Sequence, residues 1–158
     1  NMLHFEYPYL VASPYILVYG TLRQGHANNA MMHPAVYQGT YRLRKFTLLK
    51  SQHGLCFATP SKNKNDSIVV ELYKYDFNNP DIPGRIRLLE LADLNAKLDL
   101  YEQVASTLYT IFIIPIELSN SEIVYAKMYV NMHASGEIIT NGDFFGVETN
   151  VPFLKISE

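Results

Sequence analysis

Most of the chain carries apolar residues in alternation with polar ones or in short continuous runs, which is typical of β-strands. Valine, isoleucine, tyrosine and phenylalanine dominate these runs, and such residues fit a half-buried pleated surface. The pattern predicts strands over residues 15–19, 41–50, 55–58, 68–75, 108–118 and 122–131. The last two flank a Ser-Asn-Ser turn and predict an antiparallel hairpin, with a bulge or an edge position at Pro115.

One segment has a helical period instead. Between Ile86 and Glu102 apolar residues recur three or four positions apart, at Leu91, Leu94, Leu98 and Tyr101. A short helical turn is predicted at 27–32, before Pro34. Residues 1–13 predict an extended arm, and 138–146 a turn-rich tail that folds over one end of a sheet. Many strands with one late helix predict the α+β class.

The strand at 15–19 stops abruptly at Gly20, and Gly25 follows. Glycine adopts backbone angles and close approaches that a side chain forbids. Residues 20–25 therefore predict a tight loop in which several main-chain N–H groups lack a strand partner. Such a loop can hold an anion or a carbonyl oxygen, but an ordinary turn after a strand fits the same residues.

Glu102 is the candidate catalytic residue that the pattern itself singles out. It lies one turn after Leu98 and next to Tyr101, close to the apolar side of the predicted helix. Burial and the negative end of the helix dipole both disfavour its charge, so we expect a raised pKa. A glutamate that bends out to water or pairs with a lysine is the alternative.

Short segments spread over most of the chain match, in order, those of one protein family. The clearest are Val18 to Gly25 followed by Asn28, and Leu98 to Glu102 followed by Tyr109. Weaker matches lie at 54–60, 68–73, 125–129 and 139–144. On these residues the chain resembles the γ-glutamylcyclotransferase-like family, which includes AIG2-like proteins and γ-glutamylamine cyclotransferases.

The resemblance implies a small mixed β-barrel with peripheral helices. It also implies an enzyme that cleaves a γ-glutamyl amide by intramolecular attack of the α-amine, releasing 5-oxoproline and an amine. Glu102 is then the catalytic proton shuttle, and the substrate-binding residues are Tyr19, Gly20, Thr21, Leu22 and Tyr109. This cyclisation requires no metal, nucleotide or other cofactor, and its partner is a small γ-glutamyl molecule.

Two positions depart from the family pattern. Gln103 stands where a glycine usually follows the glutamate, and Ile111 stands where an arginine often follows the tyrosine by two. Loss of that arginine is expected to alter the grip on the substrate. The segment 76–97 is longer than the family pattern leads us to expect, which predicts a reshaped cavity mouth.

Composition narrows the function classes. The length of 158 residues predicts one domain, residues 1–158, with its own core. A net charge of −2 gives no basic surface for nucleic acid or for an anionic membrane. The single cysteine excludes an internal disulfide, no apolar run is long enough to cross a bilayer, and no signal peptide pattern opens the chain. A cytoplasmic protein is expected.

Other candidate residues fit structural roles. Cys56, three residues after His53, could be a nucleophile, but a lone cysteine in an apolar strand is more often inert core. The five histidines show no metal-ligand spacing. Asp99 and Asp143 are interpreted as solvated or turn-capping residues.

Two other functions fit the sequence. The first is a catalytically idle family member that binds a γ-glutamyl-like or amino-acid ligand. The second is a barrel that stacks single-stranded nucleic acid on its tyrosines, for which Arg42, Arg44 and Lys45 are too few to form a basic groove. The sequence does not predict an oligomeric state.

Overall fold

The computed structural model describes residues 3–5, 13–52, 54–102, 109–146 and 150–157. Its larger sheet has seven strands in the order β1-β7-β8-β2-β6-β3, with β10 also beside β7. These strands are β1 (Leu3–Phe5), β2 (Tyr15–Val18), β3 (Val36–Arg44), β6 (Ser67–Lys74), β7 (Thr110–Glu117), β8 (Ile123–Val130) and β10 (Lys155–Ile156). A smaller sheet has the order β5-β4-β9, from β4 (Phe46–Lys50), β5 (Cys56–Pro60) and β9 (Glu137–Ile138).

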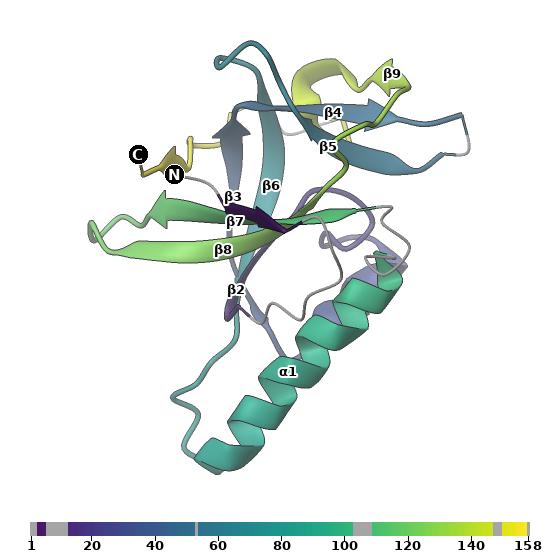
Figure 1. Ribbon diagram of the computed structural model, residues 1–158. Helices are drawn as coiled ribbons and strands as arrows, with labels where there is room; N and C mark the ends of the chain where they lie inside the picture. Colours follow the sequence, from purple (N-terminus) through teal and green to yellow (C-terminus); the bar gives the residue numbers. More distant parts are fainter. Residues whose placement is uncertain (1–2, 6–12, 53, 103–108, 147–149, 158) are drawn as a thin grey trace.

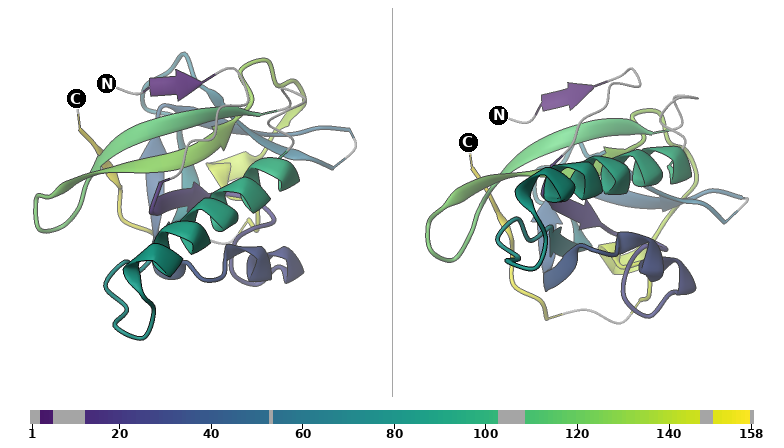
Figure 2. Two further views of the ribbon diagram at one scale, coloured as in Figure 1. Left: turned by 60° about the horizontal axis from the view of Figure 1, so that its bottom comes forward. Right: turned by 90° about the horizontal axis from the view of Figure 1, so that it is seen from below.

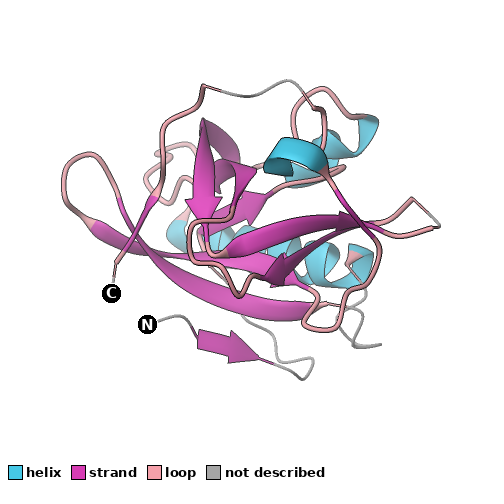
Figure 3. Cartoon of the chain, turned by 90° about the horizontal axis from the view of Figure 1, so that it is seen from above, coloured by secondary structure: helices cyan, strands magenta, loops and turns pink. Residues whose placement is uncertain are grey.

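Three helices complete the described chain: the 3-10 helices η1 (Ala27–Met32) and η3 (Thr140–Gly142), and α1 (Gly84–Tyr101). The smaller sheet lies at the top of Figure 1 and α1 at the bottom, with the larger sheet between them. η1 contacts α1, and Figure 2 shows it below the sheet on the same side as α1. Seen from above, the strands lie over α1 (Figure 3). The fold is α+β, a curled half-barrel with helices at its periphery, as the sequence predicted.

The pairing of β2 with β8 brings distant parts of the chain together. It is parallel, with Tyr15 opposite Ala126 and Ile16 opposite Lys127, whereas the other paired strands are antiparallel. The end of β2 therefore lies beside the end of β8. This places the glycine loop that follows β2 next to Tyr129.

The helix packs through part of its length only. Leu91, Leu94 and Leu98 are buried as predicted, together with Asn95, and Tyr101 is partly buried. Leu88 and Leu89, in its first half, are exposed. None of the described helices is long and apolar enough to cross a membrane.

The predicted strand over 41–50 is wrong as one element, because the chain turns at Lys45 between β3 and β4. Lys45 has φ 81°, a left-handed conformation outside the extended range of a β-strand. The corner is held by the Lys45 N–H, which donates to the Asp66 carbonyl, and by the Lys45 carbonyl, which accepts from Ser61 N–H.

The hairpin of β7 and β8 is confirmed, but Pro115 causes no bulge. Its register with β8 is continuous, with Pro115 opposite Tyr125. The Pro115 carbonyl accepts from the Ser157 N–H, so the missing proline N–H faces away from β8. Of the predicted arm, residues 3–5 form β1, and 1–2 and 6–12 lie outside the described residues. The tail forms β9 and η3, which contact β4 and β6.

Candidate active site

A cavity of about 270 Å³ lies between the end of β2, the start of β5, the end of α1 and β8. All six residues selected from the sequence line it: Tyr19, Gly20, Thr21, Leu22, Glu102 and Tyr109. The other lining residues are Leu17, Val18, Gly54, Leu55, Cys56, Tyr101 and Tyr129. Glu102 is the one carboxylate among them, and no lysine, arginine or histidine of the described chain is in this wall. The roles assigned to the six residues stay predictions.

The glycine loop enters the cavity as a tight turn. The Arg23 N–H donates to the Gly20 carbonyl at 3.0 Å, which closes a turn around Thr21 and Leu22. The N–H groups of these two central residues bond no other described residue. Within the described part of the chain, these two residues of the cavity wall therefore have main-chain donors without a partner, as the sequence predicted.

The two glycines of the loop differ in conformation. Gly25 has φ 92°, which favours glycine, whereas Gly20 is outside the positive-φ region. A Cβ placed on Gly20 would lie 3.6 Å from the Cβ of Cys56. This is an ordinary van der Waals distance, so neither the backbone angles nor the neighbouring atoms require glycine at position 20.

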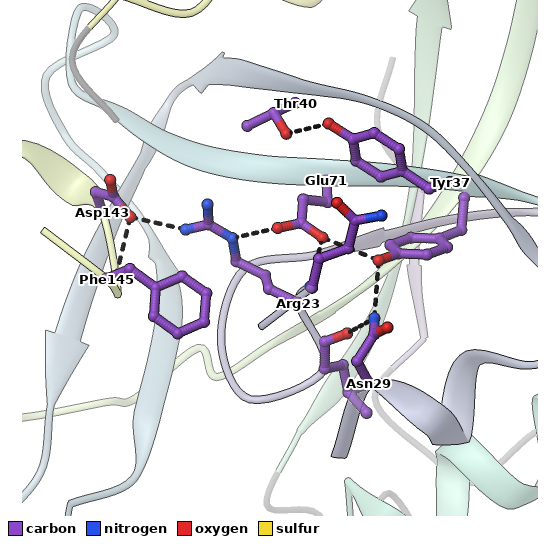
Figure 4. A network of polar contacts seen from close by, with 10 residues as sticks. Arg23, Asn29, Tyr37, Thr40, Glu71, Asp143 and Phe145 are labelled. Carbon is purple, nitrogen blue, oxygen red and sulfur yellow. Dashed lines mark hydrogen bonds and ion pairs between the residues drawn. The ribbon is translucent and has the colours of Figure 1, made fainter. Parts of the chain in front are cut away.

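Arg23, which belongs to the glycine loop, is held by two buried ion pairs. Its Nε donates to Glu71 Oε2 and its Nη1 to Asp143 Oδ1, each at 2.7 Å, and all three side chains are buried. Figure 4 shows the guanidinium between the two carboxylates, with the Phe145 ring beside it; the Arg23 Cζ is 4.8 Å from that ring's centroid. Asp143 Oδ1 also accepts from the Phe145 N–H at 3.0 Å, so its interpretation as a turn-capping residue is confirmed. The alternative of a solvated residue is wrong, because Asp143 is a buried ion-pair partner.

The network extends into the loop itself. Glu71 Oε1 accepts from the Gln24 N–H and from the Tyr73 hydroxyl, both at 2.9 Å. Asn29 Nδ2 donates to the same hydroxyl at 2.8 Å and to the Leu22 carbonyl at 2.7 Å. Charge-assisted bonds of this kind hold the loop backbone in one geometry.

Glu102 caps the C-terminal end of α1, where its N–H donates to the Leu98 carbonyl at 2.9 Å. No hydrogen bond or ion pair joins its carboxyl group to another residue of the described chain. Burial raises the pKa of Glu102 from the ordinary value of 4.5 to about 8. The predicted direction of the shift is confirmed, and desolvation is its cause.

The hydroxyl groups of two tyrosines in the cavity wall donate to main-chain carbonyl groups. The Tyr19 hydroxyl donates to the Tyr129 carbonyl at 2.6 Å, and the Tyr109 hydroxyl donates to the Cys56 carbonyl at 2.7 Å. Burial, and then neighbouring groups that include Glu102, raise the pKa of both tyrosines above the ordinary value. Both phenols stay protonated at neutral pH and give the cavity a polar but uncharged lining.

Tyr101 joins the helix end to the glycine loop. Its hydroxyl is 2.6 Å from Thr21 Oγ1 and accepts from Asn28 Nδ2 at 2.9 Å. Sequence reasoning placed Tyr101 only on the apolar face of the helix, and it missed Tyr129 as a lining residue. The match at residues 125–129 was the available signal for Tyr129.

A buried ion pair lies behind this wall. Lys127 of β8 is completely buried, and its Nζ donates to Asp99 Oδ1 at 2.6 Å and to Asn95 Oδ1 at 3.0 Å. The Tyr129 hydroxyl donates to the same Asp99 oxygen at 2.5 Å. The interpretation of Asp99 as a solvated or capping residue is therefore wrong.

Cys56 is unsuited to nucleophilic catalysis. Burial, and then the charge of Glu102, raise its pKa to about 12, so the thiol keeps its proton. His53 and Gln103 lie outside the described residues. Ile111 is buried in β7 and does not line the cavity.

We expect Glu102→Gln to unfold with a larger free energy than the wild type above pH 8, and with a similar one below pH 4.5. Below 4.5 the carboxyl group is protonated in both states; between 4.5 and 8 only the unfolded chain releases the proton, which destabilises the folded wild type. The difference reaches at most about 5 kcal/mol. Urea unfolding across this range measures it, with the exposed Glu122→Gln as control; a difference independent of pH would contradict the shift.

Comparison with known proteins matches this chain to one family. The family model described as "Gamma-glutamyl cyclotransferase, AIG2-like" matches residues 16–145. A search of the curated proteins gives no significant match.

Two solved structures have a similar fold. The uncharacterized protein PH0828 from Pyrococcus horikoshii is 19% identical, with a TM-score of 0.54 over 84% of this chain and 90% of its own. An AIG2-like protein from Mus musculus is 20% identical, with a TM-score of 0.53 over 78% of this chain and 81% of its own. The family match covers most of the chain, including the loop after β2 and Glu102, and the chain therefore belongs to the AIG2-like gamma-glutamyl cyclotransferase family.

Proposed function

We propose that this protein cleaves a γ-glutamyl amide by cyclisation, releasing 5-oxoproline and an amine. The observation that carries the proposal is the Glu102 carboxyl group, which lines the cavity without a partner among the described residues and has a pKa of about 8. A group that exchanges protons near neutral pH can act both as a base and as an acid.

Glu102 is proposed to carry protons from the α-nitrogen of the substrate to the leaving nitrogen. Its carboxylate takes a proton from the α-ammonium of the substrate, and the free amine attacks the γ-carbonyl carbon. As the ring C–N bond forms, the ring nitrogen loses a second proton. The bond to the leaving nitrogen breaks, and that nitrogen receives both protons through Glu102, one after the other, and leaves as an ammonium group. The protein then supplies no nucleophile, which agrees with the protonated thiol of Cys56.

The glycine loop is proposed to hold the acyl part of the substrate. The free N–H groups of Thr21 and Leu22 can donate to the developing oxyanion or to the α-carboxylate. Because the network around Arg23 fixes this loop, the donors are oriented before the substrate binds. Tyr19 and Tyr109 line the same cavity and are proposed to contact the bent glutamyl chain.

We expect kcat/KM to rise with pH and to level off near pH 8, because the free enzyme must carry Glu102 as the carboxylate to act as base. The pH profile of kcat/KM is measured with one active γ-glutamyl substrate, in buffers strong enough to hold each pH. A rate that is already constant well below pH 8 would assign the base to another group.

The direct test is incubation with a panel of γ-glutamyl dipeptides, γ-glutamyl amines and glutathione, followed by mass-spectrometric detection of 5-oxoproline. Product from one class establishes the reaction and the leaving amine. If the protein is folded and no member of the panel gives product, the alternative hypothesis is favoured, in which a catalytically idle protein binds a γ-glutamyl-like ligand in the cavity.

A further inference from the structure

The proposed reaction uses Glu102 and the glycine loop but leaves one costly feature unused. Lys127 is completely buried, and a buried ammonium group requires a partner to offset its desolvation. Its partner Asp99 lies on the last turn of α1, three residues before Glu102. Asp99 therefore lies about one helical turn from the proposed base.

We propose that Asp99 is a positioning residue for Glu102, holding the last turn of α1 on β8 through Lys127 and Tyr129 and balancing the Lys127 charge behind the cavity. The proposal rests on the role of Glu102 proposed above. Asp99 does not line the cavity, so it acts through the helix end and through Tyr129.

The contacts fix both ends of the connection. Asp99 Oδ1 accepts from Lys127 Nζ at 2.6 Å and from the Tyr129 hydroxyl at 2.5 Å, and both donors belong to β8. Lys127 Nζ is also 5.1 Å from the centroid of the Tyr129 ring, which lines the cavity. Residues three apart on a helix are neighbours on its surface, so the Asp99 anchor limits where the Glu102 side chain can lie.

The second anchor of this cluster is Asn95. Its Oδ1 accepts from Lys127 Nζ, and its Nδ2 donates to the Ser13 carbonyl at 3.3 Å. The cluster thus joins α1 to β8 and to Ser13, two residues before β2. A purely apolar contact between the same elements would not fix the rotation of the helix in this way.

Charged groups near Glu102 also affect its pKa. The groups around Glu102 are Tyr19 from the end of β2, Cys56 from β5, Tyr129 from β8, and Tyr109. All four have raised pKa values and are neutral near pH 8. Arg23 and Lys50 act on Cys56 from farther away, and Arg23 is neutralised by its two carboxylates.

Asp99 and Lys127 are therefore the charges that can change the titration of Glu102 when one of them is removed. Loss of the Asp99 charge leaves Lys127 unbalanced and favours the Glu102 carboxylate. Loss of the Lys127 charge leaves Asp99 unbalanced and disfavours it. Asp99 and Glu102 are about one helical turn apart, so we expect shifts of roughly one pH unit, in opposite directions.

The test follows the Glu102 carboxyl carbon by NMR in the full chain labelled with 13C-glutamate, assigned with Glu102→Gln. The midpoint is expected to fall in Asp99→Asn, to rise in Lys127→Met, and to return close to the wild-type value when both changes are combined. The exposed Asp93→Asn, on the same helix, is the matched control and should not shift. This readout needs no turnover, so failure of the proposed reaction is distinguished from failure of this inference.

Unchanged midpoints in the folded variants, or shifts of the same sign in both, would overturn the proposal even if the variants melt earlier. If one of the charge variants does not fold, Tyr129→Phe, which removes only the hydroxyl oxygen, is used to test the proposal. With the helix end less restrained, the Glu102 signal is expected to broaden or move. If the enzyme is active, we expect Tyr129→Phe to lower kcat by a larger factor than it changes KM. If this variant alters neither the Glu102 signal nor kcat, the positioning role is contradicted.

Discussion

Replacing Glu102 with glutamine is expected to lower the rate of 5-oxoproline formation by about 10²- to 10⁴-fold. Glutamine has nearly the same size and keeps a carbonyl oxygen, but it cannot accept and return the proton. The substrate is expected to bind still, because the glycine loop and the tyrosines that line the cavity are unchanged. Product is measured by mass spectrometry at matched enzyme concentrations.

The matched control for this experiment is Glu122→Gln, an exposed glutamate in the β7–β8 turn. It should form 5-oxoproline at the wild-type rate. Glu102→Gln should remain folded, and we expect it to gain stability at alkaline pH. A folded Glu102→Gln protein with full activity would remove the proposed proton shuttle.

Replacing Arg23 with methionine is expected to lower the free energy of unfolding by about 3–5 kcal/mol, because it leaves two buried carboxylates without their shared cation. Glu71 and Asp143 both bond the guanidinium at 2.7 Å. The same change should reduce any cyclotransferase activity, since the loop that carries Thr21 and Leu22 loses its support. Urea denaturation gives the stability change.

Arg44→Met is the appropriate comparison for Arg23→Met. Arg44 is exposed and lies 4.0 Å from the centroid of the Phe153 ring, so its loss is expected to cost only about 0.5–1 kcal/mol. Equal losses in the two variants would show that the Arg23 network contributes no more than a surface contact.

The sequence predicted the site better than the interactions that hold it. Glu102 could be found because the helical period ends beside it, and the glycine loop because a strand stops at Gly20. The ion-pair partners of Asp99 and Asp143 could not be found. Lys127 lies 28 residues from Asp99, and Arg23 lies 120 residues from Asp143. A single sequence contains no signal for pairings at that separation.

The errors in the fold have a similar origin. The apolar pattern continues across Lys45, so nothing local predicted the left-handed turn that separates β3 from β4. Strands β9 and β10 have two residues each and are too short to show a period. In contrast, the β7–β8 hairpin has a local turn and long alternating strands, and its prediction was confirmed.

The parallel pairing of β2 with β8 determines when the cavity can form as the chain folds. The Tyr19 hydroxyl bonds the Tyr129 carbonyl across 110 residues of sequence, so closing this contact costs a large loop entropy. During synthesis the glycine loop emerges first and the strand that completes its wall emerges last. Any ligand of this cavity must therefore bind after the final hairpin has docked, and activity recovered during refolding should follow that slow step.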